Sequence, residues 1–249
     1  MILPIALALL LQAPPPAMIV TPTDGAEMVL IPAGPFKMGS TDFKVEQPVH
    51  EIDLPAFYID KYEVTNAMYA KFVAATQYKP QGDWKKYAGE GLENYPVQSL
   101  TYADCLAYCG WAGKRLPTEA EWEKAARGTK ELRYAWGPEF MPKKCNSAEE
   151  GLKATAQVGA YKDDVSPYGV FDMVGNVSEW TSSTFAPYPL DRPLDPSTIP
   201  ADRRGRIMVR GGSYTTEAKA CRLTQRSTTM PSVVPVYWYG FRCAMDARR

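Results

Sequence analysis

A polar loop enclosed by two anchored segments dominates the last third of the chain and constrains its fold most strongly. The loop begins at residues 210–213, Arg-Gly-Gly-Ser, where two consecutive glycines permit a tight backbone approach. It continues through a threonine-rich stretch that contains Cys221, and it ends at aromatic residues 237–239 and the Gly-Phe-Arg-Cys segment 240–243. Proteins commonly place functional sites on such loops. The segment therefore predicts a site, either for redox chemistry or for binding.

The composition favours one loop-rich globular domain. With 249 residues, the chain is long enough to bury roughly 70–75% of the surface of its unfolded state. Its 22 prolines and 18 glycines, with 15 tyrosines and 6 tryptophans, indicate many turns around buried aromatic residues and disfavour a helical bundle. The 28 basic and 28 acidic residues cancel, so we expect neither a nucleic-acid partner nor binding to an anionic membrane surface.

The N-terminus carries a short apolar segment. Residues 2–12 are apolar and are followed by Pro-Pro-Pro-Ala at 14–17. About ten apolar residues are too few to span a membrane but match the apolar region of a signal peptide. We therefore predict a signal peptide at 1–17, a linker at 18–27, no transmembrane anchor, and a secreted or periplasmic location. The alternative is a wrongly assigned start or a disordered apolar tail, because no Lys or Arg precedes the apolar run.

Local patterns predict short strands and helices separated by long loops within a single domain at 28–249. We expect two strands within 28–40, strands over 49–54 and 57–64, and helices over 67–75, 102–112 and 118–127. Thr118 and Glu121 have the spacing of a capping box, which places the start of the last helix. No regular helix is expected between 128 and 210. The single histidine, His50, excludes metal sites built from several imidazoles, and we expect it on the polar face of its strand.

Residues 168–180 combine side-chain oxygens with glycines and aromatic residues. Asp172, Asn176 and Glu179, helped by backbone carbonyls, are a possible ligand set for a hard cation such as calcium. Their spacing is not that of an EF-hand loop. A structural turn capped by acidic residues is therefore the competing interpretation.

Six runs of residues together resemble the formylglycine-generating enzyme (sulfatase-modifying factor) domain family. They are 29–34 with 38–39, 62–66, 112–123, 169–180, 210–213 and 240–242, and they cover nearly everything after residue 25. The resemblance implies an α+β fold of the formylglycine-generating type, a large variant of the C-type-lectin fold with sparse strands, two main helices and much ordered loop. It also implies, for active members, copper held by two cysteines and oxygen-dependent oxidation of a sulfatase cysteine to formylglycine.

The resemblance places the catalytic segment at residues 211–221. The family reads Gly-Gly-Ser-x-x-Cys-x-x-x-x-Cys there, and this chain keeps Ser213 and the second cysteine, Cys221. Thr216 stands at the position of the first cysteine. A threonine hydroxyl is a hard, neutral donor that cannot replace a thiolate on Cu(I). Ser213 and Cys221 are thus the catalytic candidates, but we do not expect them to hold copper strongly.

The resemblance also implies structural calcium and one disulfide. The disulfide would join Cys109 and Cys243, whereas Ala126 and Arg226 occupy the positions of a second family disulfide. The first calcium site maps to Asp172, Gly175, Val177 and Glu179, and a second site maps to Asn146, Ser147 and Glu150. A bridge between Cys145 and Cys221 is an open alternative.

Two functions compete on these residues. The first is an exported binding or accessory module for a peptide, glycan or protein partner. Its binding surface would comprise Thr215, Thr216, Arg222, Tyr237, Trp238 and Tyr239, although the three aromatic residues would also suit core packing. The second is an oxygen-dependent oxidoreductase that acts through Cys221 and Ser213. A surface receptor with a variable loop at 215–239 is a third possibility.

Overall fold

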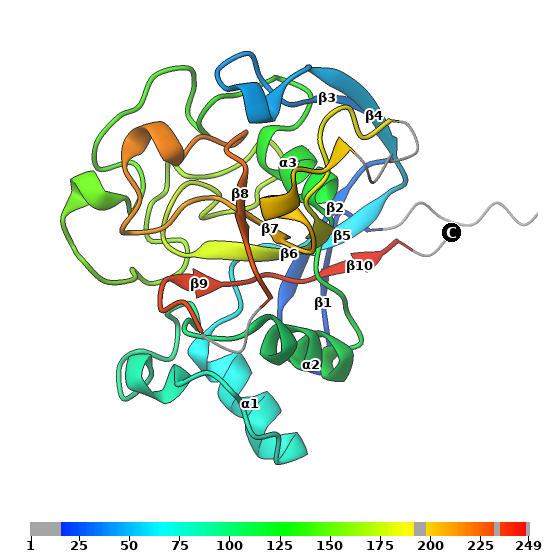
Figure 1. The fold of residues 1–249 in the computed structure, drawn as a ribbon. Coiled ribbons are helices and arrows are strands. Elements are labelled where there is room, and N and C mark those ends of the chain that lie inside the picture. Colours follow the sequence, from blue (N-terminus) through cyan, green and yellow to red (C-terminus); the bar gives the residue numbers. More distant parts are fainter. Residues whose placement is uncertain (1–15, 192–197, 232–234, 248–249) are drawn as a thin grey trace, which may run out of the picture.

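The computed structural model describes residues 16–191, 198–231 and 235–247, and Figure 1 shows their fold. Except for its last two residues, the predicted signal peptide lies outside the described residues. Within the described ranges, no helix is long and apolar enough to cross a membrane.

Three small β-sheets make up the strand content of the described residues. The first sheet is antiparallel, in the order β1 (Met18–Val20), β2 (Glu27–Ile31), β5 (Phe57–Asp60) and β10 (Ala244–Asp246). The second pairs β3 (Gly34–Met38) with β4 (His50–Leu54). The third has the order β8 (Ser227–Thr229), β7 (Ile207–Arg210), β6 (Ser178–Thr184) and β9 (Tyr239–Gly240). Strands from both ends of the chain share the first sheet.

The described residues hold three α-helices, where the resemblance implied two main ones. They are α1 (Asn66–Thr76), α2 (Tyr102–Ala112) and α3 (Glu119–Arg127). The Thr118 side chain accepts a hydrogen bond from the Glu121 amide, and the Glu121 side chain accepts one from Thr118, so the predicted capping box is confirmed. The predicted absence of a regular helix between 128 and 210 is also confirmed for the described part of that range, where the helical segments are all short 3₁₀ turns.

Two local expectations differ from the structure. Residues 18–27 were expected to be a linker, whereas Met18–Val20 forms β1 and pairs with β2. His50 was expected on a polar strand face, yet it is buried. Its Nε2 accepts a hydrogen bond from the Leu190 amide (3.0 Å), and its Nδ1 donates to the Pro48 carbonyl (2.9 Å). Pairing with two backbone groups is what makes burial of the ring acceptable.

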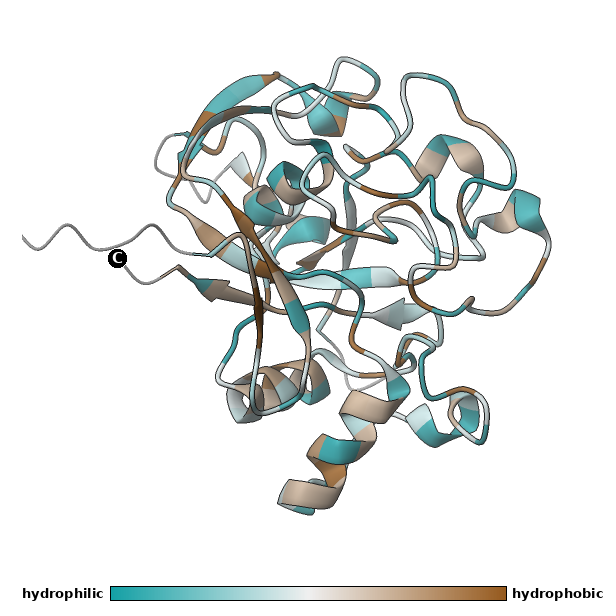
Figure 2. Ribbon diagram, turned by 180° about the vertical axis from the view of Figure 1, so that it is seen from behind, coloured by the Kyte–Doolittle hydropathy of each residue, from teal (hydrophilic) through white to brown (hydrophobic). Residues whose placement is uncertain are grey.

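Among the described residues, three clusters of buried apolar side chains form the core, and the two larger ones pack helices against sheets. The first packs α1 and α2 against the third sheet and includes Tyr69, Phe72, Tyr108, Trp180 and Phe241. The second packs α3 against the first sheet and includes Ile31, Ile59, Trp122, Met173 and Cys221. In Figure 2, strand β2 is mostly brown, that is, hydrophobic. Complete burial of each large apolar side chain stabilises the fold by about 1.5–3 kcal/mol.

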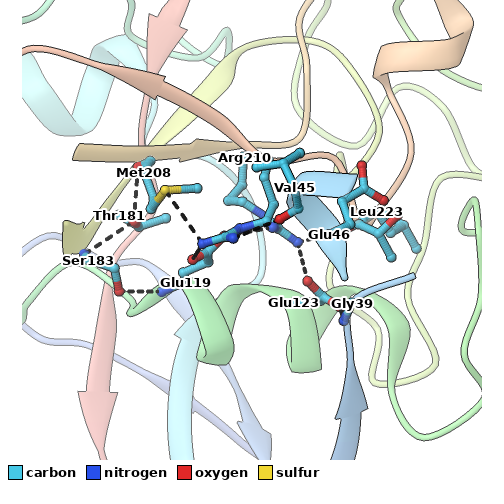
Figure 3. A network of polar contacts seen from close by, with 12 residues as sticks. Gly39, Val45, Glu46, Glu119, Glu123, Thr181, Ser183, Met208, Arg210 and Leu223 are labelled. Atoms are coloured by element: carbon cyan, nitrogen blue, oxygen red, sulfur yellow. Dashed lines mark hydrogen bonds and ion pairs between the residues drawn. The ribbon is translucent and has the colours of Figure 1, made fainter. Parts of the chain in front are cut away.

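Helix α3 is buried along its whole length although it carries many charges. Its Glu119 accepts hydrogen bonds from Arg226 (Nε, 2.7 Å; Nη2, 2.9 Å) and from Arg210 Nη1 (3.0 Å). Glu123 accepts from Arg210 Nη2, from Arg127 Nη1 (2.8 Å) and from the Gly39 amide (2.7 Å). Figure 3 shows Arg210 of β7 facing both carboxylates of α3. We call these five side chains the arginine–glutamate network.

The network connects segments that are distant in sequence. Arg226 also donates to the carbonyls of Val45 and Ala186 and lies 3.8 Å from the centre of the Tyr188 ring. Buried charges are tolerated only when they are paired and hydrogen-bonded. The network therefore fixes α3 against β7, which leads directly into the glycines at 211–212.

Replacement of Arg210 tests how strongly the fold depends on this network. Arg210→Met leaves Glu119 and Glu123 short of partners in the core, and we expect it to lower the free energy of unfolding by about 3–5 kcal/mol. Lys37→Met breaks an exposed pair with Glu131 and should leave stability unchanged within error. Urea unfolding followed by tryptophan fluorescence measures both. Equal effects of the two substitutions would show that the network contributes no more to the free energy of unfolding than an exposed ion pair does.

Candidate functional site

The site loop, residues 211–221, begins where β7 ends and closes at the 3₁₀ turn Ala218–Ala220. Gly211 and Gly212 have φ angles of 90° and 77°, which favour glycine. A Cβ on Gly212 would lie 2.9 Å from the Cys221 sulfur. The glycine pair therefore permits the tight approach that the sequence indicated, and the neighbour approached is the thiol of the same loop.

Three hydroxyl groups form a cluster at the start of the site loop. Ser213 Oγ lies 2.9 Å from Thr215 Oγ1 and 3.1 Å from Thr216 Oγ1. The Ser213 amide donates to Thr216 Oγ1 (3.0 Å), and the Thr215 amide donates to Ser213 Oγ (3.2 Å). Ser213 is buried and Thr215 is exposed. The Thr216 hydroxyl is thus occupied in holding the loop closed.

The Cys221 thiol is buried beside this cluster. Its sulfur lies 3.4 Å from the Thr216 carbonyl oxygen, to which it donates. Burial raises the pKa of the thiol well above its ordinary value of 9.0, and the negative charges of Glu149 and Asp164 add to the rise. The thiolate is the form that ligates metals and attacks electrophiles. Cys221 is therefore a protonated thiol at neutral pH.

Residues around position 148 fix the outer edge of the site loop. Glu149 accepts hydrogen bonds from the Ala218 amide (2.7 Å) and from the Ser147 hydroxyl (2.8 Å). The Ala148 amide donates to the Thr216 carbonyl (3.0 Å). Ser147, a predicted calcium ligand, is here a donor to Glu149. The sequence did not reveal this role of Glu149. It is the neighbour of Glu150, which was predicted to be a calcium ligand.

The predicted binding surface is only partly exposed. Tyr237 is 46% exposed and contacts Trp238 edge to face at 4.4 Å between ring centres. Tyr239 packs on the ring of Trp180 at 5.3 Å, so its side chain belongs with the core. Thr215, Tyr237 and the half-buried Trp238 are the members that a partner can reach.

Arg222 is not part of a binding surface, which corrects the expectation. The side chain is fully buried, and both of its terminal nitrogens donate to Glu46 at 2.8 Å. It also donates to Asp42 at 3.1 Å. A guanidinium taken out of water requires this pairing. Arg222 directly follows the site loop in sequence, and it anchors the end of the loop to Glu46 rather than contacting a partner.

Both carboxylates predicted to bind calcium at the first site accept hydrogen bonds from protein groups. Arg242 donates to both carboxylate oxygens of Glu179 at 2.8 Å, and the Trp122 indole donates to one of them at 2.9 Å. Asp172 accepts from the Gly159 amide (2.6 Å). Among the described residues, no group of three or more His, Cys, Asp or Glu side chains is arranged for a metal ion. Glu179 as arranged does not fit a calcium site, and calcium binding stays a prediction.

At the second site, Asn146 and Ser147 make side-chain hydrogen bonds, whereas the Glu150 side chain makes none with the part of the chain that the structure describes. Asn146 Nδ2 donates to the Ala154 carbonyl (2.9 Å) and to Asn176 Oδ1 (3.1 Å). Asn146 Oδ1 is buried without a hydrogen-bond partner. Glu150 closes the 3₁₀ turn Ala148–Glu150 and is partly exposed. The unpaired Asn146 oxygen and the Glu150 carboxylate are the features here that would suit a cation.

Two further buried carboxyl groups, Glu63 and Asp164, were not identified from sequence as site residues. Burial and the charge of Asp172 raise the pKa of both. Burial also raises the pKa of Asp172 to about 6. Arg242 is hydrogen-bonded to Glu179, and its positive charge partly offsets the rise in the pKa of the other three carboxyl groups. Glu63 lies in the run at 62–66 that carries the resemblance, which was the available signal.

The two cysteines expected to form a disulfide lie together. The sulfurs of Cys109 and Cys243 are 3.5 Å apart and both side chains are buried. They are free thiols in the structure, as are the buried Cys105, Cys145 and Cys221. The two bonds considered from sequence stay predictions.

Comparisons with known proteins agree on one family. The domain family described as "Sulfatase-modifying factor enzyme 1-like domain" matches residues 16–247. The formylglycine-generating enzyme of Streptomyces coelicolor is 34% identical, and the match covers 94% of this chain and 96% of that protein. The inactive C-alpha-formylglycine-generating enzyme 2 of Bos taurus is 32% identical, with 89% of each chain covered. Similarity therefore extends equally to a protein named as an enzyme and to one named as inactive.

A solved structure also matches over the whole domain. The structure of PvdO from Pseudomonas aeruginosa has a TM-score of 0.77 and 28% identity, and the match covers 95% of this chain and 100% of that one. The α+β fold of this family, which the sequence predicted, is thereby confirmed.

The raised pKa of Asp172 predicts how stability depends on pH when no metal is added. Its protonated form is favoured in the folded protein, so its contribution is complete below its ordinary pKa of 3.8 and is lost as pH rises through about 6. In a chelator, the melting temperature should fall between about pH 4 and about pH 6.5, and this carboxyl group should cause no further fall above that range. Asp172→Asn should reduce this fall. Its φ of 59° suits asparagine, so the variant should fold.

Asp163→Asn, which changes an exposed carboxylate nine residues earlier, is the matched control and should keep the wild-type pH profile. Calcium added at about pH 7.5 should restore the melting temperature if Asp172 takes part in a calcium site. A flat pH profile in the chelator, or identical profiles for the two variants, would contradict the assignment. No response to calcium would remove the calcium prediction.

Proposed function

The chain belongs to the sulfatase-modifying factor enzyme 1-like family, and we propose that it serves within this family as a binding or accessory module rather than as a copper oxidase. The proposal rests on one observation in the site loop, the threonine at position 216 and its hydrogen bonds. Thr216 replaces one expected copper ligand and is hydrogen-bonded to Ser213. The apolar residues 2–12 support the further proposal that the protein is exported.

The residues of the site loop do not fit a copper centre. Cu(I) selects soft thiolate ligands, and two are needed for a linear site of the kind that the family resemblance implies. Thr216 supplies a neutral hydroxyl, and burial keeps Cys221 protonated. The same facts weigh against the alternative oxidoreductase acting through Cys221 and Ser213, because neither group is activated as a nucleophile.

The exposed part of the same region suits recognition of a partner. The pKa of Tyr214 is raised to about 12 by burial and by the nearby phenols of Tyr87 and Tyr237. Tyr87 and Tyr237, from two separate segments, are therefore near enough to Tyr214 to affect its pKa. Together with Trp238 and the exposed Thr215, they combine apolar area with hydroxyl groups, which is the composition of many binding hot spots. We propose a peptide, glycan or protein ligand for this surface.

Restoration of the missing cysteine tests the loss of copper. We expect wild-type protein to compete poorly for Cu(I) against a chromogenic chelator, and Thr216→Cys to bind one equivalent at least about tenfold more tightly. Thr215→Cys adds a thiol one residue earlier, on the exposed side of the loop, and is the matched control. Stoichiometric Cu(I) binding by the wild type, as tight as that of Thr216→Cys, would overturn the proposal.

Screening of peptide and glycan arrays tests the binding surface. We expect a defined class of ligand to be retained, and Tyr237→Ala to lower its affinity by about tenfold or more. Met18→Ala, which shortens a comparably exposed apolar side chain on β1, should leave affinity unchanged. Equal binding by the two variants would place the binding surface elsewhere. No retained ligand on either array would leave the binding module without support and count against it.

A further inference from the structure

Residues 185–191 follow β6 and cover Arg226 of the arginine–glutamate network. The rings of Phe185 and Tyr188 lie over the Arg226 guanidinium, with their centres 5.3 and 3.8 Å from its central carbon. The Ala186 carbonyl accepts a hydrogen bond from Arg226 Nη2 (2.9 Å). Because Phe185 and Tyr188 are buried themselves, we call residues 185–191 the covering segment. It shares no residue with the site loop, so an inference about it does not depend on the proposed function.

A histidine ties the far end of the covering segment to β4. The Leu190 amide donates to His50 Nε2 (3.0 Å), and His50 Nδ1 donates to the Pro48 carbonyl (2.9 Å). The imidazole also packs edge to face on Tyr188, with 4.6 Å between the ring centres. A neutral imidazole has one donor and one acceptor, and a backbone amide can only donate. The contacts of His50 therefore require the neutral ring and use both of its nitrogens.

Protonation of His50 removes the acceptor that the Leu190 amide needs. An imidazolium carries a donor at each ring nitrogen and has no acceptor. The Leu190 N–H would then point at the Nε2–H, and a rotated ring would bring another N–H to the same place. A buried donor without an acceptor destabilises the arrangement that holds it. A protonated ring is therefore incompatible with the closed covering segment.

The surroundings of His50 do not compensate a positive charge on its ring. Within residues 16–191, 198–231 and 235–247 it takes part in no ion pair, and the titratable side chain packed on it is Tyr188, whose pKa is raised by burial. The charges on the neighbouring elements are paired or exposed. Paired are the arginine–glutamate network, Lys37 with Glu131, and Glu46 with Arg222, whereas Glu51, Asp53 and Asp191 are exposed.

We propose that His50 is a pH-sensitive switch: protonation of its ring releases residues 188–191 from β4, and deprotonation closes the covering segment again. Histidine is the side chain whose charge ordinarily changes between about pH 8 and about pH 5. In the released state Tyr188 and Leu190 are exposed and water reaches Arg226. The near end of the segment stays in place, because Arg226 still holds the Ala186 carbonyl. The change is a local opening rather than unfolding of the domain.

NMR spectroscopy of the full chain, labelled with ¹⁵N and with ¹³C in the histidine ring, tests the proposal. The chain has one histidine, so a single ring signal reports its protonation. Between about pH 7.5 and about pH 5, the Leu190 amide signal should shift with the same midpoint as the ring signal. The order parameter of this amide should fall from about 0.85 to below about 0.6, while those of α2 stay constant. A return to about pH 7.5 should restore the first spectrum.

Two substitutions of His50 fix the switch in different ways. His50→Phe keeps an aromatic ring beside Tyr188 but offers the Leu190 amide no acceptor, so the segment should be open at both pH values. His50→Gln places an uncharged carboxamide there, so the order parameter of the Leu190 amide should no longer depend on pH. Asp53→Asn, which removes an exposed carboxylate from the same strand, is the matched control and should keep the wild-type midpoint.

Four results would overturn the proposal. They are a ring that stays neutral down to about pH 5, a ring that titrates without any change at the Leu190 amide, loss of order throughout the chain at the same midpoint, and the wild-type pH response in His50→Gln. An ordered Leu190 amide in His50→Phe at about pH 7.5 would count equally against it. If His50→Phe does not fold, the titrations of the wild type and of Asp53→Asn still decide between a local switch and acid unfolding.

Discussion

The pairing of Arg210 and Arg226 with Glu119 and Glu123 is the interaction on which the rest of the structure depends. It allows a helix as charged as α3 to be buried throughout, and it joins that helix to β7. Strand β7 then delivers the chain into the glycine pair of the site loop. A buried ion pair is weak evidence for extra stability, but removal of one partner is strongly destabilising. The arginine–glutamate network and β7 therefore fix the position of the site loop independently of the residues in the loop itself.

On this fixed scaffold, the chemistry of the loop depends on a few atoms. The Thr216 hydroxyl is hydrogen-bonded to both the amide and the hydroxyl of Ser213. The buried Cys221 thiol donates to the Thr216 carbonyl. The polar side chains of the loop are thus hydrogen-bonded to one another. The family resemblance implies copper ligands at these positions in active members. The family resemblance implies two cysteines in this loop for active members, and this chain, which is 34% identical to the formylglycine-generating enzyme of Streptomyces coelicolor, has Thr216 and Cys221 at those positions.

The sequence predicted what depends on local or family patterns. The capping box at Thr118 and Glu121, the helix limits and the glycine pair follow from short-range rules, and the structure has them. Partners distant in sequence could not be predicted. The pairing of Arg222 with Glu46 spans 176 residues, and it moved an expected surface residue into the core. The same holds for the buried carboxyl groups of Glu63 and Asp164, since neighbouring residues do not reveal which acids the fold brings around Arg242.

The central proposal is that this member of the family is not a copper-dependent oxidase. The most direct measurement is mass spectrometry of a Cys-x-Pro-x-Arg peptide after incubation with the copper-loaded protein, oxygen and a reductant. The account predicts that the peptide cysteine stays intact over many hours, while a formylglycine-generating enzyme run in parallel converts it. Conversion of the cysteine to formylglycine by this protein, at more than one peptide per protein molecule, would contradict the account.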